Sequence, residues 1–401
     1  MMAPHLSALV DRVWGSDTSS PVRVTTSDIP DGHEVVERYA VIPNFEKAKF
    51  LVPLGSHAAA VNSLWKYNAM KSLSTRSGHV ALAAAFKSRL ATLAFHDQLV
   101  VSCDRRLDRG ERAEWMVLDH LARELNFPRL LAAMTVRRKN PNAKPTLQLF
   151  TPGGVPMGYA KLGWSQATRA MVQTEAASLE AVSGKLTSVL APHVMAKGIW
   201  NGRYYVVVSP LPESVRRWST PPLQAPHLIL DVAHSGEVAH GHLAGSPYER
   251  RLRQQLDEVG ETPETRILSA WLDRLVGESF PLEFGRWHGD WVAWNMGSAG
   301  AKVAVWDWEH SAPLVPVGFD ALHWHFQQTL PAHGIEAAVL AVDGATLDLV
   351  ALGVTPSAAP HLVSLYLLEM FVRSVRLANG GGGWNPRLYP KMLTIAEARD
   401  R

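Results

Sequence analysis

Apolar residues recur with two different periods along this chain, and the change of period divides it into segments. Between residues 130 and 209 short apolar runs alternate with turn residues, which is typical of strands. We expect strands at 130–138, 146–150, 156–162, 193–200 and 203–209, with one helix at 165–182 capped by Ser165. Asn201-Gly202 between the last two strands is a strong hairpin signal. The order is three strands, one helix and two strands.

The flanking regions have mixed patterns. Residues 39–43 and 50–54 resemble short strands, and helical spacing predicts helices at 57–70, 79–95 and 111–126. After a Pro-rich connecting stretch at 211–245, helical spacing returns at 247–259, 263–276, 319–329, 334–341 and 361–378. Two short strands, 283–287 and 302–306, interrupt this helical part. We therefore expect three units: an accessory or capping domain over 1–104, a strand-rich lobe over 105–210 and a helical lobe over 211–401, in the α+β class.

The composition excludes several classes of protein. The 401 residues are 47% hydrophobic and 19% charged, and the net charge is only +3, so neither disorder nor a nucleic-acid partner is indicated. Cys103 is the single cysteine and excludes an internal disulfide. No run approaches the roughly 18 apolar residues of a membrane span, and residues 1–17 do not resemble a signal peptide. We expect a cytoplasmic protein without a membrane partner.

The informative chemistry lies in residues 287–309. Four residues separate His288-Gly289-Asp290 from Asn295, and Asp307 comes twelve residues after Asn295. Phosphoryl transfer uses a carboxylate that accepts or orients the hydroxyl proton, together with a second carboxylate and an amide oxygen that hold Mg²⁺. A tight loop and a returning hairpin would bring these groups together.

This pattern resembles the aminoglycoside phosphotransferase and choline kinase superfamily, whose members have a two-lobed protein-kinase-like fold. The resemblance covers about residues 105–378 and departs from the protein-kinase signature by Gly289 for Arg and by Trp-Glu after Asp307. It implies that Asp290 is the catalytic base, that His288 braces the loop, and that Asn295 and Asp307 bind Mg²⁺. Gly318-x-Asp320 matches a further, structural motif of the family.

The strand-rich lobe offers a matching nucleotide site. Lys161 lies on the third predicted strand and Glu175 on the next helix, as a phosphate-binding lysine and its partner would, with Glu180 as the rival partner. The resemblance makes residues 208–211 the hinge, so that Ser209 and Leu211 would meet the adenine of ATP, or of GTP. The basic run 137–144 stands where a glycine-rich loop would cover the phosphates, and we interpret it as a solvated turn.

Candidate acceptor-binding residues crowd the same motif. Trp291, Trp294 and Trp324 could stack on a sugar ring or could pack in the core, and Glu309 could bind a cation. After residue 310 seven acidic residues face six basic ones, which favours a neutral polyol or sugar over a polyamine. The histidines at 234, 240 and 242, and the pair His323 and His325, are not interpreted as metal ligands.

These observations predict a phosphotransferase that binds ATP and Mg²⁺ between its lobes and phosphorylates a hydroxyl of a small molecule. A nucleotide-binding pseudokinase without an acceptor is the first alternative, and a metal-dependent hydrolase built on Asp290 and Asp307 is the second. The sequence leaves open the acceptor, the choice between ATP and GTP, the oligomeric state and the role of residues 1–104.

Overall fold

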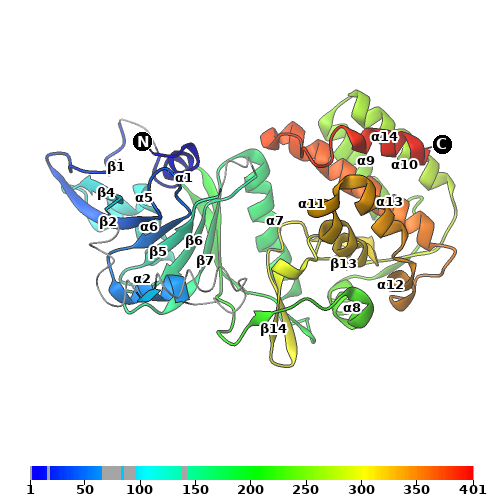
Figure 1. Ribbon diagram of the computed structural model, residues 1–401, viewed down its shortest axis with the longest axis horizontal. Coiled ribbons are helices and arrows are strands. Elements are labelled where there is room, and N and C mark those ends of the chain that lie inside the picture. Colours follow the sequence, from blue (N-terminus) through cyan, green and yellow to red (C-terminus); the bar gives the residue numbers. More distant parts are fainter. Residues whose placement is uncertain (1, 16–18, 66–82, 85–95, 138–141, 401) are drawn as a thin grey trace. The chain divides into compact units, whose positions relative to one another are not determined.

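The computed structural model describes residues 2–15, 19–65, 83–84, 96–137 and 142–400, and they form two compact units (Figure 1). The first unit comprises Met1–Ala176 and Pro192–Arg216, and the second comprises Ala177–Ala191 and Arg217–Arg401. The predicted α+β class, with a lobe built on an antiparallel sheet and a larger helical lobe, is confirmed.

One nine-stranded sheet organises the first unit, in the order β1-β4-β2-β3-β5-β6-β7-β10-β9. Every neighbouring pair in it is antiparallel. The strands are β1 (Val22–Thr25), β2 (His33–Ile42), β3 (Phe50–Pro53), β4 (Gln98–Asp104), β5 (Leu131–Thr135), β6 (Thr146–Phe150), β7 (Pro156–Gly163), β9 (Val194–Trp200) and β10 (Arg203–Val208). The helices of this part of the chain are α1 (Pro4–Trp14), α2 (His57–Trp65), α5 (Arg109–Trp115), α6 (Val117–Glu124) and α7 (Gln166–Val182).

Residues 1–104 are not set apart from the strand-rich lobe. Strand β3 pairs with β5, with Leu51 opposite Met134, so strands from both segments form one sheet. The boundary predicted at residue 104 therefore does not coincide with a boundary between compact units. The physical reason is that each segment has an edge strand with unpaired backbone groups, and pairing the two edges satisfies them.

The alternation of side chains along β2 explains why both faces of the sheet are covered. Val41 packs in a core with Leu6 of α1 and Leu121 of α6. Its neighbour Ala40 belongs to a second core with Leu64 of α2. Successive residues of a strand point to opposite faces, so one strand contributes to two apolar layers.

Most of the local predictions in this unit that can be checked are confirmed, but β1 and β4 were not predicted and one predicted helix is divided. Asn201 and Gly202 have φ of 44° and 69°, as a two-residue hairpin turn between β9 and β10 requires. The single helix predicted over 111–126 is instead α5 and α6, because buried Met116 adopts an extended conformation between them. Of the helices predicted over 57–70 and 79–95, α2 covers the described part of the first, and residues 66–82 and 85–95 lie outside the described residues.

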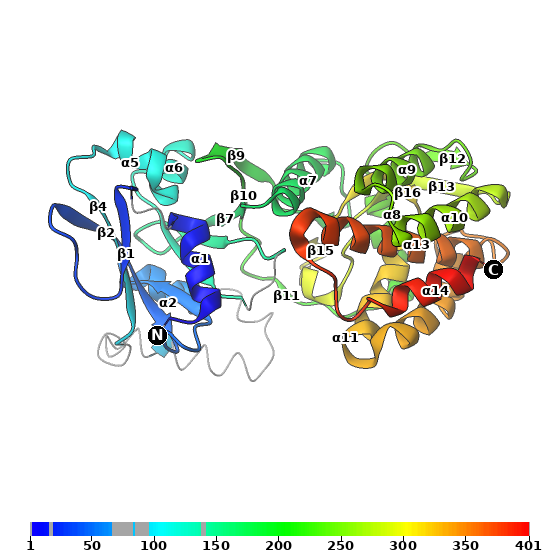
Figure 2. The ribbon, with the colours of Figure 1, turned by 90° about the horizontal axis from the view of Figure 1, so that it is seen from above.

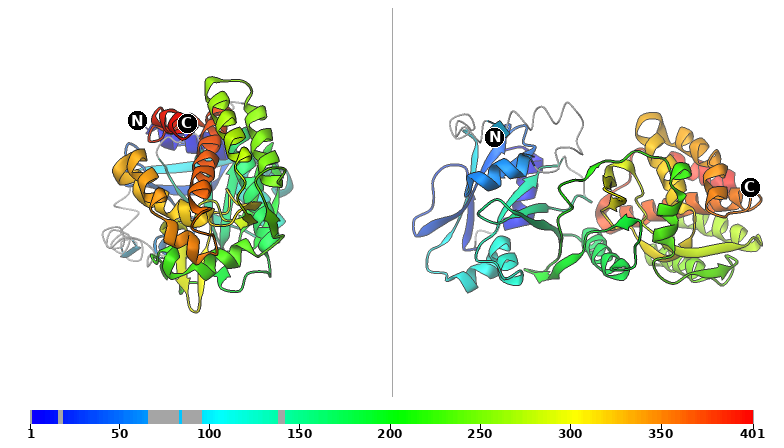
Figure 3. Two further views of the ribbon diagram at one scale, coloured as in Figure 1. Left: turned by 90° about the vertical axis from the view of Figure 1, so that its right-hand side faces the viewer. Right: turned by 90° about the horizontal axis from the view of Figure 1, so that it is seen from below.

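The second unit is mainly helical. Its long helices α9, α10, α13 and α14 pack against one another around one apolar core (Figures 2 and 3). The helices are α8 (Pro226–Ala233), α9 (Pro247–Val259), α10 (Pro263–Gly277), α11 (Phe319–Asp343), α12 (Thr346–Ala351), α13 (Ala359–Leu377) and α14 (Lys391–Asp400), with short turns η2 (Pro222–Gln224), η3 (Ala293–Asn295) and η4 (Ala378–Gly382).

Two small sheets position the loops of the second unit. One holds β14 (Met296–Ala299), β15 (Lys302–Val305) and β8 (Val189–Leu190), and the other runs β12 (Ala239–Gly241), β13 (Leu282–Trp287), β16 (Ala312–Pro316). Strand β11 (Arg216–Arg217) lies where the chain passes from one unit to the other.

The helices predicted at 247–259, 263–276 and 361–378 are confirmed as α9, α10 and α13. The two predicted at 319–329 and 334–341 both lie in α11, which is interrupted at Gly334 (φ 84°). Helices α8, α12 and α14 were not predicted; α8 lies inside the stretch interpreted as connecting structure. Within the described part of the chain, every helix is too short or too polar to cross a lipid bilayer.

Candidate functional site

The loop after β13 carries Asp290, and its backbone at position 289 strongly favours glycine. Gly289 has a φ of 81°, which side-chain-bearing residues rarely adopt. A Cβ atom there would lie 2.2 Å from the backbone oxygen of His310. The backbone of the loop therefore lies against the backbone of residue 310, and this close contact fixes the position of the neighbouring Asp290.

Asp320 and Arg373 hold the loop backbone through hydrogen bonds. The two carboxylate oxygens of Asp320, on the first turn of α11, accept hydrogen bonds from the amides of His288 (2.7 Å) and Gly289 (2.9 Å). Burial raises the pKa of Asp320 to about 7, although these amide hydrogen bonds oppose the rise. Arg373 of α13 donates to the carbonyl of Gly289 (2.9 Å), and its guanidinium lies 4.8 Å from the centre of the Trp287 ring.

His288 joins the loop to the segment after β15. Its Nδ1 accepts from the amide of Asp290 (3.2 Å), so its Nε2 carries the proton and donates to the carbonyl of Trp306 (3.1 Å). The side chain is completely buried, and this burial lowers the pKa of His288 to about 4. At neutral pH the imidazole is neutral and both of its nitrogens are hydrogen-bonded to the backbone, so its role is to support the loop and not to transfer protons.

Asp290 is held by both of its carboxylate oxygens. Oδ2 accepts from Nδ2 of Asn295 (2.8 Å), and Oδ1 lies 3.1 Å from Nε2 of His323. Burial would raise the pKa of Asp290, but the hydrogen bond with His323 opposes this effect and helps to keep that pKa below its usual value. A quarter of the side chain remains exposed. The result is a fixed, ionised and accessible carboxylate.

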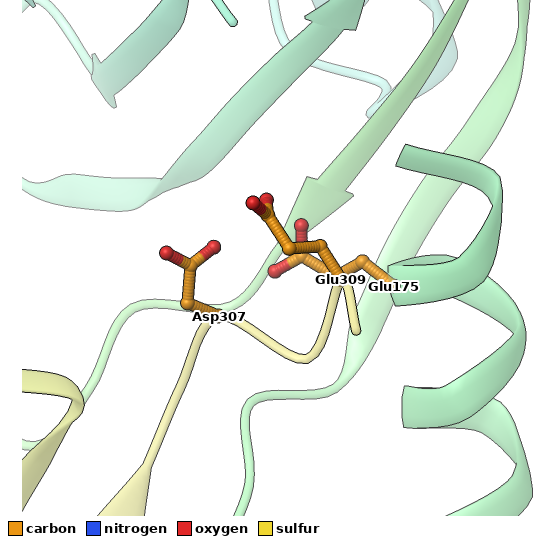
Figure 4. A group of neighbouring side chains, drawn as sticks. All are labelled: Glu175, Asp307 and Glu309. Atoms are coloured by element: carbon orange, nitrogen blue, oxygen red, sulfur yellow. The ribbon is translucent and has the colours of Figure 1, made fainter. Parts of the chain in front are cut away.

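A hairpin brings Asn295 and Asp307 together. Met296 pairs with Val305 at the open end of the β14–β15 ladder, and the amide of Trp306 donates to the carbonyl of Asn295 (3.1 Å). Trp306 is therefore opposite Asn295, and Asp307 is the next residue along the chain. Figure 4 shows Asp307 and Glu309 on the segment after β15, and Glu175 on α7. Asp307 has a φ of 70°, a left-handed conformation that Asp tolerates better than most residues.

The tryptophans of the motif divide into buried and exposed rings. Trp291 is 2% exposed and packs edge-on to His288, and Trp324 is 7% exposed. Trp294, in the turn before Asn295, is 55% exposed. The Glu309 side chain is 13% exposed and lies 3.7 Å from His310. Of the three candidate acceptor-binding indoles, only Trp294 presents a large free face.

The first unit carries the predicted lysine and glutamate as an ion pair. Lys161 on β7 and Glu175 on α7 lie 2.7 Å apart, and their side chains are 12% and 2% exposed. Glu180, the rival partner, is on an exposed face of the helix. Lys161 is flanked by strands on both sides, since it lies opposite Thr146 on β6 and Val206 on β10. The sheet thus fixes the lysine stem, and α7 supplies the counter-charge.

The other predicted nucleotide-site residues follow β10. The hydroxyl of Ser209 accepts from the amide of His193 (3.1 Å), and Leu211 is partly buried. In the basic run 137–144, residues 138–141 lie outside the described residues, and Lys144 lies 3.5 Å from the sulfur of Met171.

His323 and Tyr366 contribute to the site without having been predicted to do so. Both are almost completely buried: 1% and 0% exposed. His323 and His325 were not interpreted as metal ligands, and the structure gives them different partners, since His325 lies 3.2 Å from Asp348. A sequence signal existed, since Asp320 and His323 are polar residues one turn apart on an otherwise apolar helical stretch.

Comparison with known proteins gives matches among solved structures only. Neither the protein-family models nor the curated proteins contain a match to this chain. A Haemophilus somnus protein named as a fructosamine-3-kinase is 10% identical over 71% of this chain and 95% of its own, with a TM-score of 0.43. An aminoglycoside 2′-phosphotransferase in complex with GDP is 11% identical over 68% and 91%, with a TM-score of 0.40. A glucosamine kinase in complex with glucosamine, ADP and inorganic phosphate is 16% identical over 99% and 98%, with a TM-score of 0.34.

Proposed function

We propose that this protein is an ATP- and Mg²⁺-dependent phosphotransferase that moves the γ-phosphoryl group to a hydroxyl of a small molecule. The observation that carries the proposal is the state of Asp290. Its carboxylate is ionised, and hydrogen bonds to both oxygens fix its orientation. One quarter of the side chain is still exposed. The same loop carries Asn295, whose amide oxygen is a type of ligand that binds metal ions. This is the arrangement that orienting an attacking hydroxyl requires.

In the proposed reaction Asp290 accepts a hydrogen bond from the acceptor hydroxyl. The hydroxyl oxygen forms a bond to the γ-phosphorus as the bond from that phosphorus to the departing ADP oxygen breaks, and the hydroxyl proton passes to Asp290. A pKa below the usual value makes Asp290 a weak base. Weak basicity suffices, because little negative charge develops on the attacking oxygen in a loose phosphoryl-transfer transition state.

The residues present fit a magnesium ion. Nδ2 of Asn295 is directed to Asp290, so its Oδ1 is the atom that would bind a cation, and Asp307 supplies a carboxylate at the facing end of the hairpin. Oxygen donors of this kind suit Mg²⁺. A bound Mg²⁺ would offset the negative charge of the phosphate oxygens.

Lys161 is proposed to hold the nucleotide phosphates, with Glu175 fixing its ammonium group. Ser209 and Leu211 are proposed to meet the nucleotide base through their backbone. Trp294 offers the exposed aromatic face on which a sugar ring could stack. We propose a sugar, a sugar-like metabolite or an aminoglycoside as the acceptor. We favour a neutral polyol because acidic and basic residues nearly balance after residue 310, seven against six.

The test is an acceptor screen with ATP and Mg²⁺ over sugars, aminoglycosides and nucleosides, read by mass spectrometry as the gain of one phosphate. Asp290→Asn should lower the transfer rate by about 10²–10⁴-fold. Asp273→Asn is the matched control, because Asp273 forms only a surface ion pair with Arg253. Phosphate release without a phosphorylated product would point to a hydrolase, and nucleotide binding without either would point to a pseudokinase; both outcomes contradict the proposal.

A further inference from the structure

A buried line of hydrogen bonds leads away from Asp290 into the core of the second unit. Oδ1 of Asp290 lies 3.1 Å from Nε2 of His323, and Nδ1 of His323 lies 3.1 Å from the hydroxyl of Tyr366. Exposure falls along this line from 25% at Asp290 to 1% at His323 and 0% at Tyr366. His323 belongs to α11 and Tyr366 to α13, so the line ties the loop to two helices.

The chemistry of the three groups fixes the direction of each hydrogen bond. An ionised carboxylate only accepts, so Nε2 of His323 must carry a proton and donate it. Burial lowers the pKa of His323 and raises that of Tyr366 well above its ordinary value. The imidazole is therefore neutral, its Nδ1 is an acceptor, and the protonated Tyr366 hydroxyl donates to it. Besides Asp290, the ionisable groups that act on this line are Asp320, Glu369 and Arg373, and the charge of Arg373 further disfavours a positive charge on His323.

Aromatic packing holds both rings in place. The Tyr366 ring meets Phe319 and Phe326 edge-on, with centroids 5.6 Å and 6.0 Å away. The His323 ring meets Trp287 edge-on at 6.5 Å. Both rings are thus buried among aromatic side chains, and the two hydrogen bonds of His323 favour the orientation in which Nε2 faces Asp290.

We propose that His323 is a positioning residue for the phosphoryl-transfer reaction: it holds Oδ1 of Asp290 while Asn295 holds Oδ2, and Tyr366 fixes the imidazole tautomer that allows this. The inference rests on the proposed function. With His323 removed, Asn295 alone would restrain the carboxylate, and Asn295 is also proposed to bind the metal. A carboxylate with one restraint samples several orientations, so the attacking hydroxyl is aligned less often.

The kinetic test separates positioning from core filling. His323→Leu fills the same space without a donor, whereas His323→Gln places an amide N–H near the former Nε2. We expect His323→Leu to lower kcat by about 10–100-fold, by analogy with the loss of an outer residue that orients a functional ligand. KM for ATP and for the acceptor should stay within about threefold, because His323 is not proposed to touch either. His323→Gln should recover most of kcat, and Tyr366→Phe should lower it by a smaller factor.

His325→Gln is the matched control on the same helix, since His325 pairs with Asp348 and not with the loop. It should leave kcat unchanged. Equal losses of kcat in His323→Leu and His323→Gln, at matched thermal stability, would overturn the proposal. So would a His323→Leu variant with the wild-type kcat.

A spectroscopic test needs neither an acceptor nor turnover. In ¹⁵N NMR spectra at pH 7.5, with the His323 signals assigned by their loss in His323→Gln, Nε2 should be of the protonated, pyrrole type and Nδ1 of the unprotonated, pyridine type. Tyr366→Phe should produce a mixture of tautomers. An imidazolium, or a proton on Nδ1, would overturn the inference. Because this result is independent of phosphoryl transfer, a failed acceptor screen would refute the proposed function and leave the tautomer assignment to be decided on its own.

Discussion

Replacing Gly289 by alanine tests the geometry on which the whole site depends. The new Cβ would lie 2.2 Å from the oxygen of His310 and 2.7 Å from its carbonyl carbon, both backbone atoms. Ordinary contact needs about 3.2–3.5 Å, so the loop and residue 310 would have to separate by about 1 Å. Gly289 is bonded on both sides, to Asp320 through its N–H and to Arg373 through its oxygen, so it cannot shift alone. The displacement would pass directly to Asp290.

The magnitudes follow from this displacement. A misplacement of about 1 Å in a catalytic group costs about 10²-fold in rate. The left-handed φ of 81° adds about 1–2 kcal/mol of backbone strain for alanine, and the forced contact adds about 1–3 kcal/mol more. We therefore expect Gly289→Ala to fold with a lowered melting temperature and to lose about 100-fold in kcat. The assay is coupled ADP release with the acceptor identified by the screen, beside thermal unfolding of the same preparation.

Gly260→Ala separates strain from collision. Gly260 ends α9 with a φ of 85°, but a Cβ there would meet nothing within 4 Å. This variant should therefore carry the backbone strain alone and keep the wild-type kcat. If Gly289→Ala retained kcat within threefold of wild type, or lost no more stability than Gly260→Ala, the account of the loop given above would be refuted.

Two further predictions concern the first unit. Lys161→Met leaves the Glu175 carboxylate, which is 2% exposed, without its ammonium partner, so it should lower the free energy of unfolding by about 3 kcal/mol. Adding Glu175→Leu should restore most of this stability, because an apolar pair can replace a buried ion pair. Nucleotide affinity should stay lost in both variants. Urea unfolding and titration with a fluorescent nucleotide would measure these effects, and a nucleotide affinity that returned with stability would contradict them. Burial raises the pKa of Glu37 from 4.5 to about 7, although the hydrogen bonds from Tyr39 (2.7 Å) and Trp14 (3.3 Å) oppose the rise. The folded protein therefore binds this proton more tightly than the unfolded chain does, so the stabilisation is complete below pH 4.5 and is lost as the pH rises through 7, by about 3 kcal/mol at most. Glu37→Gln should match wild type near pH 5 and exceed it in stability near pH 8.5, and an unchanged difference at the two pH values would argue against this.

Much of the local structure could be predicted because its causes lie within a few residues. Asn201-Gly202 determines a tight hairpin through positive φ angles alone. The cap at Ser165, whose hydroxyl accepts from the amide of Thr168 (3.2 Å), likewise needs no distant partner. Met116 shows the limit of such reasoning: helical spacing continues through 111–126, but tertiary packing buries Met116 in an extended conformation and divides the helix.

The residues of the candidate site could be predicted to a similar extent. The residues that carry the proposed chemistry stand in one segment, and a hairpin of a few residues necessarily places Asn295 near Asp307. The support behind Asp290 was not predictable in this way. His323 and Tyr366 lie 33 and 76 positions away from it along the chain, and nothing in the local pattern of α11 or α13 indicates which loop they meet.

The sequence by itself determined the order of elements, the turns and the identity of the polar groups, because periodicity, capping and turn chemistry act over short stretches of chain. Only the tertiary structure decided that β3 and β5 join two segments into one sheet and that Glu175, not Glu180, pairs with Lys161. It also decided that a buried histidine holds the carboxylate of Asp290. Such pairings depend on how whole helices and strands pack, and packing is settled by the sum of many weak contacts rather than by any short motif.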